Sequence, residues 1–142
     1  MSAEQSPGAL VLVTRLSRLV YRSATEDVLG MRLKQFAALS YLRHFPGVGQ
    51  RQLGDAMHLD ANNCVLLLND IEAAGWAERR RDPDDRRRHV VEITESGLKA
   101  LAHAEHALDG LEDELLPGLS ADERDTLRDL LERAVAGVPA AV

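Results

Sequence analysis

The feature that most constrains the fold is a change of hydrophobic period between residues 50 and 94. Apolar side chains first recur with the spacing of helices, and strand-forming residues then follow in two short stretches. The predicted elements are helices over 50–57 and 61–74 and strands over 76–81 and 89–94. Asp60 is a suitable N-cap for the second helix, and Gly75 is a suitable residue to end it. The segment therefore predicts two consecutive helices followed by a β-hairpin.

Helical periods also flank this segment on both sides. The predicted elements are helices over 9–29, 32–45 and 96–116, and a last helix that follows a capping box at Ser120 and Glu123. The apolar seam of 96–116 has the 3-4 spacing of a helix that packs along another helix; its members are Leu101, Ala104, Leu108, Leu111 and Leu115. The tail, 138–142, is expected to be frayed. The whole order predicts a mainly α (α+β) chain, a winged helix-turn-helix with a two-stranded wing between additional helices.

Length and composition restrict the class of protein further. The 142 residues, 45% of them hydrophobic and 28% charged, are typical of one folded domain over 1–142. No apolar run approaches the roughly 18 residues of a membrane span, the start lacks a signal-peptide layout, and the single Cys64 has no disulfide partner within the chain. We therefore expect a cytoplasmic protein. Because no nucleophile elbow, phosphate-binding glycine loop or HExxH motif occurs, we predict no enzyme activity, no catalytic residue and no cofactor.

Charge is distributed unevenly along the chain. The formal net charge is −6, but residues 100–142 hold three arginines against ten acids, whereas 79–88 hold six arginines against three aspartates. Such a protein repels a polyanion over most of its surface and can bind one at the hairpin. A solvated charged loop is the alternative interpretation. We favour nucleic-acid contact because the arginines follow the predicted helix-turn-helix directly.

The helix over 61–74 has two distinct faces. Its inward face is predicted to carry Cys64, Leu67, Leu68 and Ile71. Its outward face and flanks carry Asn62, Asn63, Val65, Leu66, Asn69 and Ala73. Asparagine can pair with adenine in a major groove and an apolar side chain can contact a thymine methyl, so this face could read A/T-rich DNA. The alternative is that the asparagines cap the helix and Leu66 packs on a neighbour.

Residues 32–101 resemble the MarR family of bacterial transcriptional regulators. The resemblance rests on the stretches 52–57, 67–76, 80–87 and 93–97. Its specific parts are an Asp-Pro-x-Asp-x-Arg wing and a Leu/Ile-Thr-x-x-Gly strand end, here Asp82-Pro83-Asp84-Asp85-Arg86-Arg87 and Ile93-Thr94-Glu95-Ser96-Gly97. The flanking helices fit the family's plan, so the resemblance extends over nearly the whole chain.

The resemblance implies a homodimer on a pseudo-palindromic operator in double-stranded DNA, associated with the nucleoid. It implies a winged helix-turn-helix lobe over about 32–99 and dimerisation helices over about 8–29 and 100–138. By position, Asp85 would support Arg87, which would enter the minor groove. The DNA-binding residues expected are Asn62, Asn63, Val65, Leu66, Asn69, Arg81, Asp85, Arg86, Arg87 and Arg88. Many members have Ser or Thr at the position of Val65 and Arg at that of Leu66, so the operator sequence does not transfer.

The resemblance also implies a repressor released by a small aromatic or phenolic carboxylate, bound between the dimer helices and the DNA-binding lobe. Arg15 borders the apolar stripe of the helix over 9–29, and Arg15, Tyr21 and His44 are the candidate ligand-binding residues. An arginine whose stem packs while its head meets an acid or solvent is the alternative for Arg15.

Cys64 and the histidines of the helix over 96–116 allow other functions. Cys64 could sense oxidation, although its inward position favours a small buried side chain. His103 and His106, near Asp109 and Asp113, could bind a metal, but a polar helix face explains them better and no metal site is predicted. The rival function is a winged-helix protein-interaction module without specific DNA binding, suggested by the net acidity and by the lack of arginine on the helix over 61–74.

Overall fold

The computed structural model describes residues 6–138, so the expectations for the first residues and for the tail lie almost entirely outside the described part. The elements, in order, are α1 (Ala9–Ser23), α2 (Glu26–Leu29), α3 (Leu33–His44), β1 (Val48–Gly49), α4 (Gln50–Ala56), α5 (Ala61–Ala73), β2 (Ala77–Arg81), β3 (His89–Ile93), α6 (Glu95–Leu115) and α7 (Ala121–Ala136). This order is the predicted winged helix-turn-helix between additional helices.

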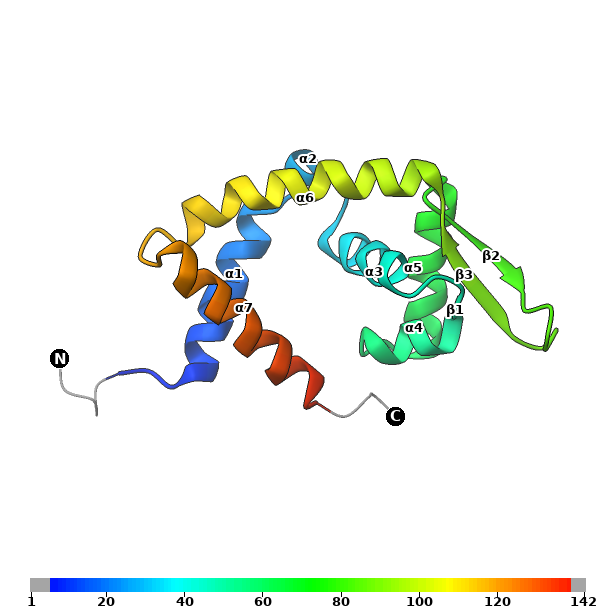
Figure 1. Cartoon of the computed structure of the whole chain (residues 1–142), viewed down its shortest axis with the longest axis horizontal. Helices are drawn as coiled ribbons and strands as arrows, with labels where there is room; N and C mark the ends of the chain where they lie inside the picture. The colour runs from blue at the N-terminus through cyan, green and yellow to red at the C-terminus, as the bar shows by residue number, and fades with distance from the viewer. Residues whose placement is uncertain (1–5, 139–142) are drawn as a thin grey trace.

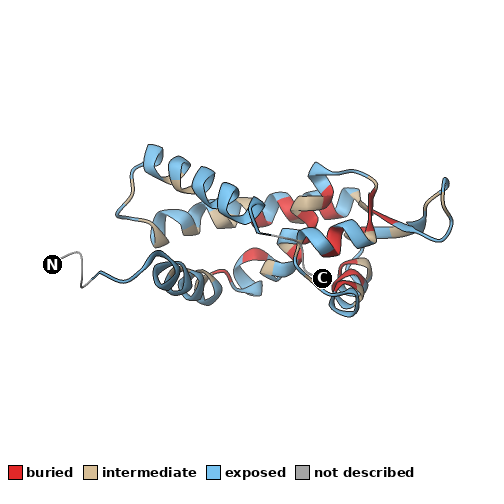
Figure 2. Ribbon diagram, turned by 90° about the horizontal axis from the view of Figure 1, so that it is seen from below, coloured by how far each residue is buried: buried red, intermediate tan, exposed pale blue. Residues whose placement is uncertain are grey.

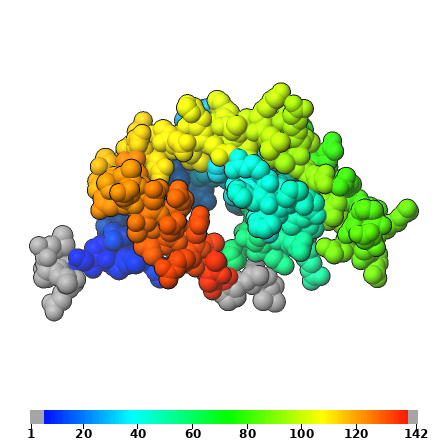
Figure 3. All heavy atoms as spheres, in the orientation of Figure 1, coloured from blue at the N-terminus to red at the C-terminus, as the bar shows by residue number. Residues whose placement is uncertain are grey.

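The long helix α6 connects the two halves of the molecule. It runs from the end of the hairpin along one side of the structure, with α1 and α7 near its far end (Figure 1). The elements from α3 to β3 form the lobe at the other end. A hollow separates α7 from α3 in the space-filling view (Figure 3). None of the helices in the described part is both long and apolar enough to cross a membrane.

The buried core lies mainly within the lobe and where α6 crosses it. Leu39, Leu53, Leu68, Val91 and Leu101 are fully buried there. In contrast, α1 and α7 contain no buried residue, and both are exposed over most of their length (Figure 2). The terminal helices therefore contribute little to the core of a single chain.

The prediction of one helix over 9–29 was wrong, because α1 ends at Ser23 and α2 begins at Glu26. Thr25 adopts an extended backbone as the N-cap of α2, ahead of two acids in its first turn, a placement that the helix dipole favours. Gly30 then ends α2 with a φ of +77°. The break turns the chain so that Leu29 and Met31 reach the core, where both are 0% exposed.

The predicted two-stranded wing is part of a three-stranded antiparallel sheet with strand order β1-β3-β2. The third strand, β1, was not predicted; it pairs Val48 with Val91 and Gly49 with Val90. Two residues are too few to show an alternating pattern. We call β2, β3 and the turn over 82–88 the wing.

The capping residues predicted at Asp60, Gly75 and Ser120 are confirmed. The Asp60 carboxylate accepts a hydrogen bond from the backbone N–H of Asn63 at 2.8 Å, and Gly75 has a φ of +80°. The backbone N–H of Glu123 donates to the Ser120 hydroxyl, and the Ser120 N–H donates to the Glu123 carboxylate. That pair of bonds lowers the pKa of the Glu123 carboxyl.

Candidate nucleic-acid interface

Helix α5 presents the two faces that its sequence predicts. Cys64, Leu67, Leu68 and Ile71 are buried against the lobe, which turns the opposite side of the helix to the surface. Asn62, Asn63, Leu66 and Asn69 are exposed, and Val65 is half-buried. The Leu66 side chain is 53% exposed, so more than half of it faces solvent on the outer side of the helix.

The two asparagines at the start of α5 differ in their contacts. The side-chain amide of Asn63 donates to Asp60 at 3.0 Å, in addition to the backbone bond of the cap. Asn63 is thus held in the helix cap, which is the alternative interpretation of this residue. Asn62 makes no side-chain hydrogen bond within the described residues, so its amide can pair with a ligand without breaking an internal bond.

Two arginines of the wing are bonded within the hairpin itself. Arg80 pairs with Glu92 on the adjacent strand, Nη2 to Oε1, at 2.6 Å. The guanidinium of Arg81 donates to the backbone carbonyl oxygen of Arg86 at 2.6 Å, which closes the loop between the strands. Arg81 therefore shapes the turn from which the other arginines project.

Arg79 instead reaches from β2 to α5. Its Nε pairs with Glu72, and its Nη2 donates to the side-chain oxygen of Asn69 at 2.5 Å. Asn69, predicted to contact DNA, is therefore also a contact between the helix and the wing.

The turn of the wing orients Arg87. The Asp85 carboxylate accepts from the Arg87 backbone N–H at 3.1 Å and from the Arg87 Nε at 3.2 Å. One carboxylate oxygen therefore positions both the backbone and the guanidinium of Arg87. The Arg87 side chain is 91% exposed. The side-chain hydrogen bond from Arg87, followed by the backbone one, lowers the pKa of the Asp85 carboxyl. Arg86 and Arg88 are exposed on either side, and the tip of the wing projects from the molecule (Figure 1).

Thr94 attaches the base of the wing to the end of α5. Its hydroxyl donates to the carbonyl oxygen of Gly75 at 2.6 Å and accepts from the N–H of Gly97 at 3.0 Å. Its backbone N–H donates to the carbonyl oxygen of Trp76 at 2.9 Å. The Ile-Thr-x-x-Gly stretch thus caps α6 and fixes where the hairpin leaves the helix-turn-helix.

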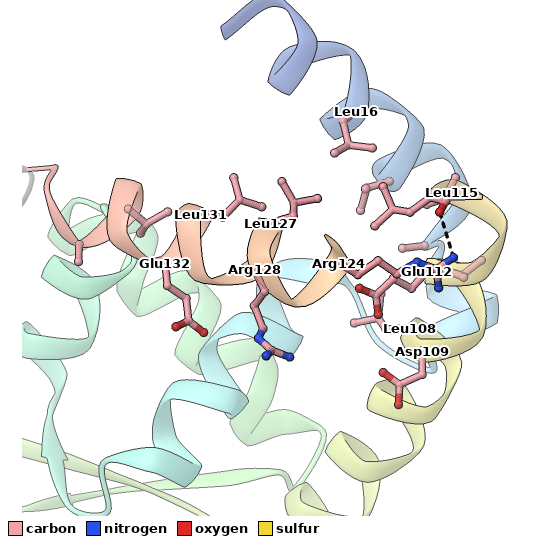
Figure 4. A pocket seen from close by; sticks show the side chains of 16 residues that line it. Leu16, Leu108, Asp109, Glu112, Leu115, Arg124, Leu127, Arg128, Leu131 and Glu132 are labelled. Carbon is pink, nitrogen blue, oxygen red and sulfur yellow. Dashed lines mark hydrogen bonds between the residues drawn. The ribbon is translucent and has the colours of Figure 1, made fainter. Parts of the chain in front are cut away.

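Two apolar grooves border the terminal helices. The first, about 650 Å³, lies between α1, α6 and α7, where Leu16 faces Leu127 and Leu131 (Figure 4). The second, about 660 Å³, lies between α1, α3 and α7, and Tyr21 and Lys34 contribute to its lining.

The candidate ligand-binding residues fall in different places. Tyr21 lines the second groove, whereas Arg15 and His44 are among the lining residues of neither groove. His44 Nδ1 contacts the carbonyl oxygen of Ser40 on its own helix at 2.9 Å. Lys34, which was not among the predicted candidates, lines the second groove. Its place beside Leu33 and three residues before Ala37 puts it at the edge of the apolar stripe of that helix.

Cys64 and the histidines occupy the environments favoured from sequence. Cys64 is 3% exposed, and burial raises the pKa of its thiol, which disfavours the reactive thiolate. His103 and His106 are exposed on α6. Over residues 6–138, no group of three or more histidine, cysteine or acidic side chains is placed to hold a metal ion.

Known regulators resemble this chain in sequence. A putative transcriptional regulatory protein for the hcr operon of Thauera aromatica is 35% identical over 98 residues, which cover 69% of this chain and 59% of that protein. The chain thus spans less than two thirds of this relative. The multiple antibiotic resistance protein MarR of Escherichia coli is 31% identical over 103 residues, 71% of each chain.

Solved structures share the fold over almost the full length. The transcriptional repressor CouR, bound to a 23-mer DNA duplex, is 27% identical with a TM-score of 0.80, covering 93% of this chain and 95% of its own. The regulator PcaV of Streptomyces coelicolor, in complex with its natural ligand, is 25% identical with a TM-score of 0.75, covering 96% of both chains. A sequence model of the MarR family matches residues 29–88. The chain therefore belongs to the MarR family of transcriptional regulators.

Proposed function

We propose that this protein is a homodimeric, sequence-specific DNA-binding repressor that a small aromatic or phenolic carboxylate releases from its operator. The observation that carries the proposal is Arg87, held by Asp85 and 91% exposed at the tip of the wing. The wing begins at the end of α5, whose outer face exposes Asn62 and Leu66. Because major and minor grooves alternate along a duplex, a helix face and a projecting cation of this kind can contact neighbouring grooves.

Electrostatics favour an approach of DNA to the wing. Arg86 and Arg87 are exposed in its turn, and Arg88 is exposed where the turn closes onto Asp82. In contrast, the residues from 100 onward hold three arginines against ten acids. Phosphate contacts at the tip release counterions, so the affinity should fall as salt increases. The acidic surface of α6 and α7 would at the same time disfavour other orientations on the duplex.

The exposed apolar side chains of α1 and α7 support a dimer. Leu10 is 81% exposed and Val135 is 60% exposed. Helices that expose several large apolar side chains are typical of surfaces that a partner covers. Covering both helices with those of a second copy would bury these side chains and place two α5 helices on one face. The half-sites of the operator would then be spaced by about one helical turn, roughly 10 bp.

The groove between α1, α3 and α7 is suited to the effector. It joins two of the terminal helices to the lobe that carries α5, so a bound molecule would contact both parts. Tyr21 and Lys34 provide a hydroxyl and a cation at an otherwise apolar surface, which suits an aromatic acid. Such a ligand weakens DNA binding only if it prefers a spacing of the α5 helices that the operator does not accept.

The test is a fluorescence-anisotropy titration of the purified protein with DNA from its own upstream region and with a scrambled duplex. We expect tight, salt-dependent binding to the upstream DNA and a loss of affinity with one member of a panel of aromatic acids. Arg87→Ala should weaken binding and flatten its salt dependence. Equal, weak binding to both duplexes would refute the proposal and favour the protein-interaction module.

A further inference from the structure

The contact between Arg79, Asn69 and Glu72 ties the wing to α5. Asn69 and Glu72 lie three residues apart on α5, so they share one face of the helix. One guanidinium bonds both, through Nε to Glu72 and Nη2 to Asn69. The Arg79 and Glu72 side chains are 23% and 32% exposed. Within the described residues, every side-chain hydrogen bond between α5 and the wing runs through Arg79.

The same contact determines which way the Asn69 amide points. A guanidinium carries donors and no acceptor, so the group facing Arg79 must be the amide oxygen. The amide nitrogen of Asn69 is therefore turned away from Arg79. Only this orientation of the amide makes a hydrogen bond with arginine.

This orientation limits what Asn69 can read in a major groove. The bidentate pair with adenine requires the amide oxygen to accept from the base while the amide nitrogen donates to it. In this structure one of the two lone pairs of the amide oxygen accepts from Arg79, which fixes the plane of the amide and leaves its N–H groups without a partner among the described residues. Asn69 therefore meets a base mainly as a donor. Acceptor edges, such as N7 and O6 of guanine or O4 of thymine, suit a donor.

We propose that Arg79 is a positioning residue for DNA recognition: it holds Asn69 as a hydrogen-bond donor and thereby sets the base preference at one position of the operator. This inference rests on the proposed DNA-binding function. It also modifies the sequence-based expectation that the asparagines of α5 read adenine, since that expectation treats the amide as free to use both of its polar groups.

The experiment compares Arg79→Met with Arg80→Met on a library of operator duplexes in which each base pair is varied in turn. The two arginines are neighbours in β2, and each substitution removes one positive charge and leaves one glutamate without its partner. Arg80 pairs with Glu92 inside the wing, so its loss does not release Asn69. Thermal unfolding verifies that both variants fold. If Arg79→Met does not fold, Arg79→Lys replaces it, because a lysine ammonium keeps the charge but cannot bond Asn69 and Glu72 at once as the forked guanidinium does.

We expect Arg79→Met to change the preference at one base pair toward adenine by about tenfold. Arg80→Met should keep the wild-type order of preferences, and Asn69→Ala should abolish the effect of Arg79→Met. An equal loss of affinity for all duplexes, or the same change in the Asn69→Ala background, would overturn the inference while leaving the proposed function intact. A wild-type protein without operator preference would refute both.

Discussion

Replacing Gly97 with alanine should destabilise the protein, although alanine is normally preferred to glycine in a helix. Gly97 lies in the first turn of α6, and a Cβ there would lie 2.1 Å from the carbonyl oxygen of Trp76 and 2.8 Å from Cγ1 of Ile93. Ordinary contact begins near 3.4 Å, so the two backbones must separate by more than 1 Å. The Trp76 carbonyl also accepts from the N–H of Thr94, and this bond must stretch as the backbone moves.

The magnitude follows from opposing terms. Overpacking of this kind costs about 1–3 kcal/mol, and weakening the backbone hydrogen bond costs about 1 kcal/mol more. The gain in helix propensity is about 1 kcal/mol. We therefore expect a net loss of about 2 kcal/mol in the free energy of unfolding, which lowers the midpoint of thermal unfolding by roughly 5 °C for a chain of this length.

Gly110 offers a matched control on the same helix. A Cβ at Gly110 meets nothing within 4 Å, so Gly110→Ala should raise the free energy of unfolding by about 0.5–1 kcal/mol. Both variants are measured by circular dichroism at one protein concentration, because the unfolding midpoint of the proposed dimer would depend on concentration. If Gly97→Ala matched or exceeded the wild-type midpoint, the argument from the Trp76 carbonyl would be wrong.

Three further predictions concern the site. The pKa of the Asp85 carboxyl is lowered in the folded protein. Its bond to Arg87 should therefore be complete above the ordinary aspartate pKa of about 4 and be lost as the pH falls through the lower, folded pKa. In an NMR titration, the Arg87 Nε–H resonance should be constant from pH 7 to about 5 and move only at lower pH. Lys34→Met should weaken binding of an aromatic acid by about tenfold or more and leave operator affinity unchanged, as calorimetry and anisotropy would show. Cys64→Ser should lose about 1–3 kcal/mol of stability yet release DNA in response to its inducer like the wild type. A wild-type protein that releases DNA on treatment with an oxidant, together with a Cys64→Ser variant that does not, would instead support the oxidation sensor.

Local chemistry made much of the DNA-binding lobe predictable. The buried side of α5 follows from apolar spacing within one helix, and its ends follow from Asp60 and Gly75. The Asp85–Arg87 contact joins residues two apart in one turn, and the family resemblance predicted it from their positions in the sequence. Such features involve neighbours in the chain, so the sequence carries the information directly.

Other features required the tertiary structure. The break after Ser23 lets Leu29 and Met31 reach a core built by distant segments. The apolar spacing of the stretch does not show this break, and Thr25 with its two following acids marks a new helix only once the packing is known. Arg15 and Lys34 both border apolar stripes, but the placement of α1 against α3 and α7 puts Lys34 in the groove between them and leaves Arg15 out of its lining.

The sequence by itself determined the order of elements, the helix caps, the two faces of α5 and the family. Only the tertiary structure decided that Arg79 reaches Asn69 and Glu72, and that Gly97 passes the carbonyl of Trp76 too closely for a side chain. Hydrophobic period and capping depend on residues within one or two turns, whereas these contacts depend on how β2 and α6 lie against other elements. That placement is set by packing across the whole lobe.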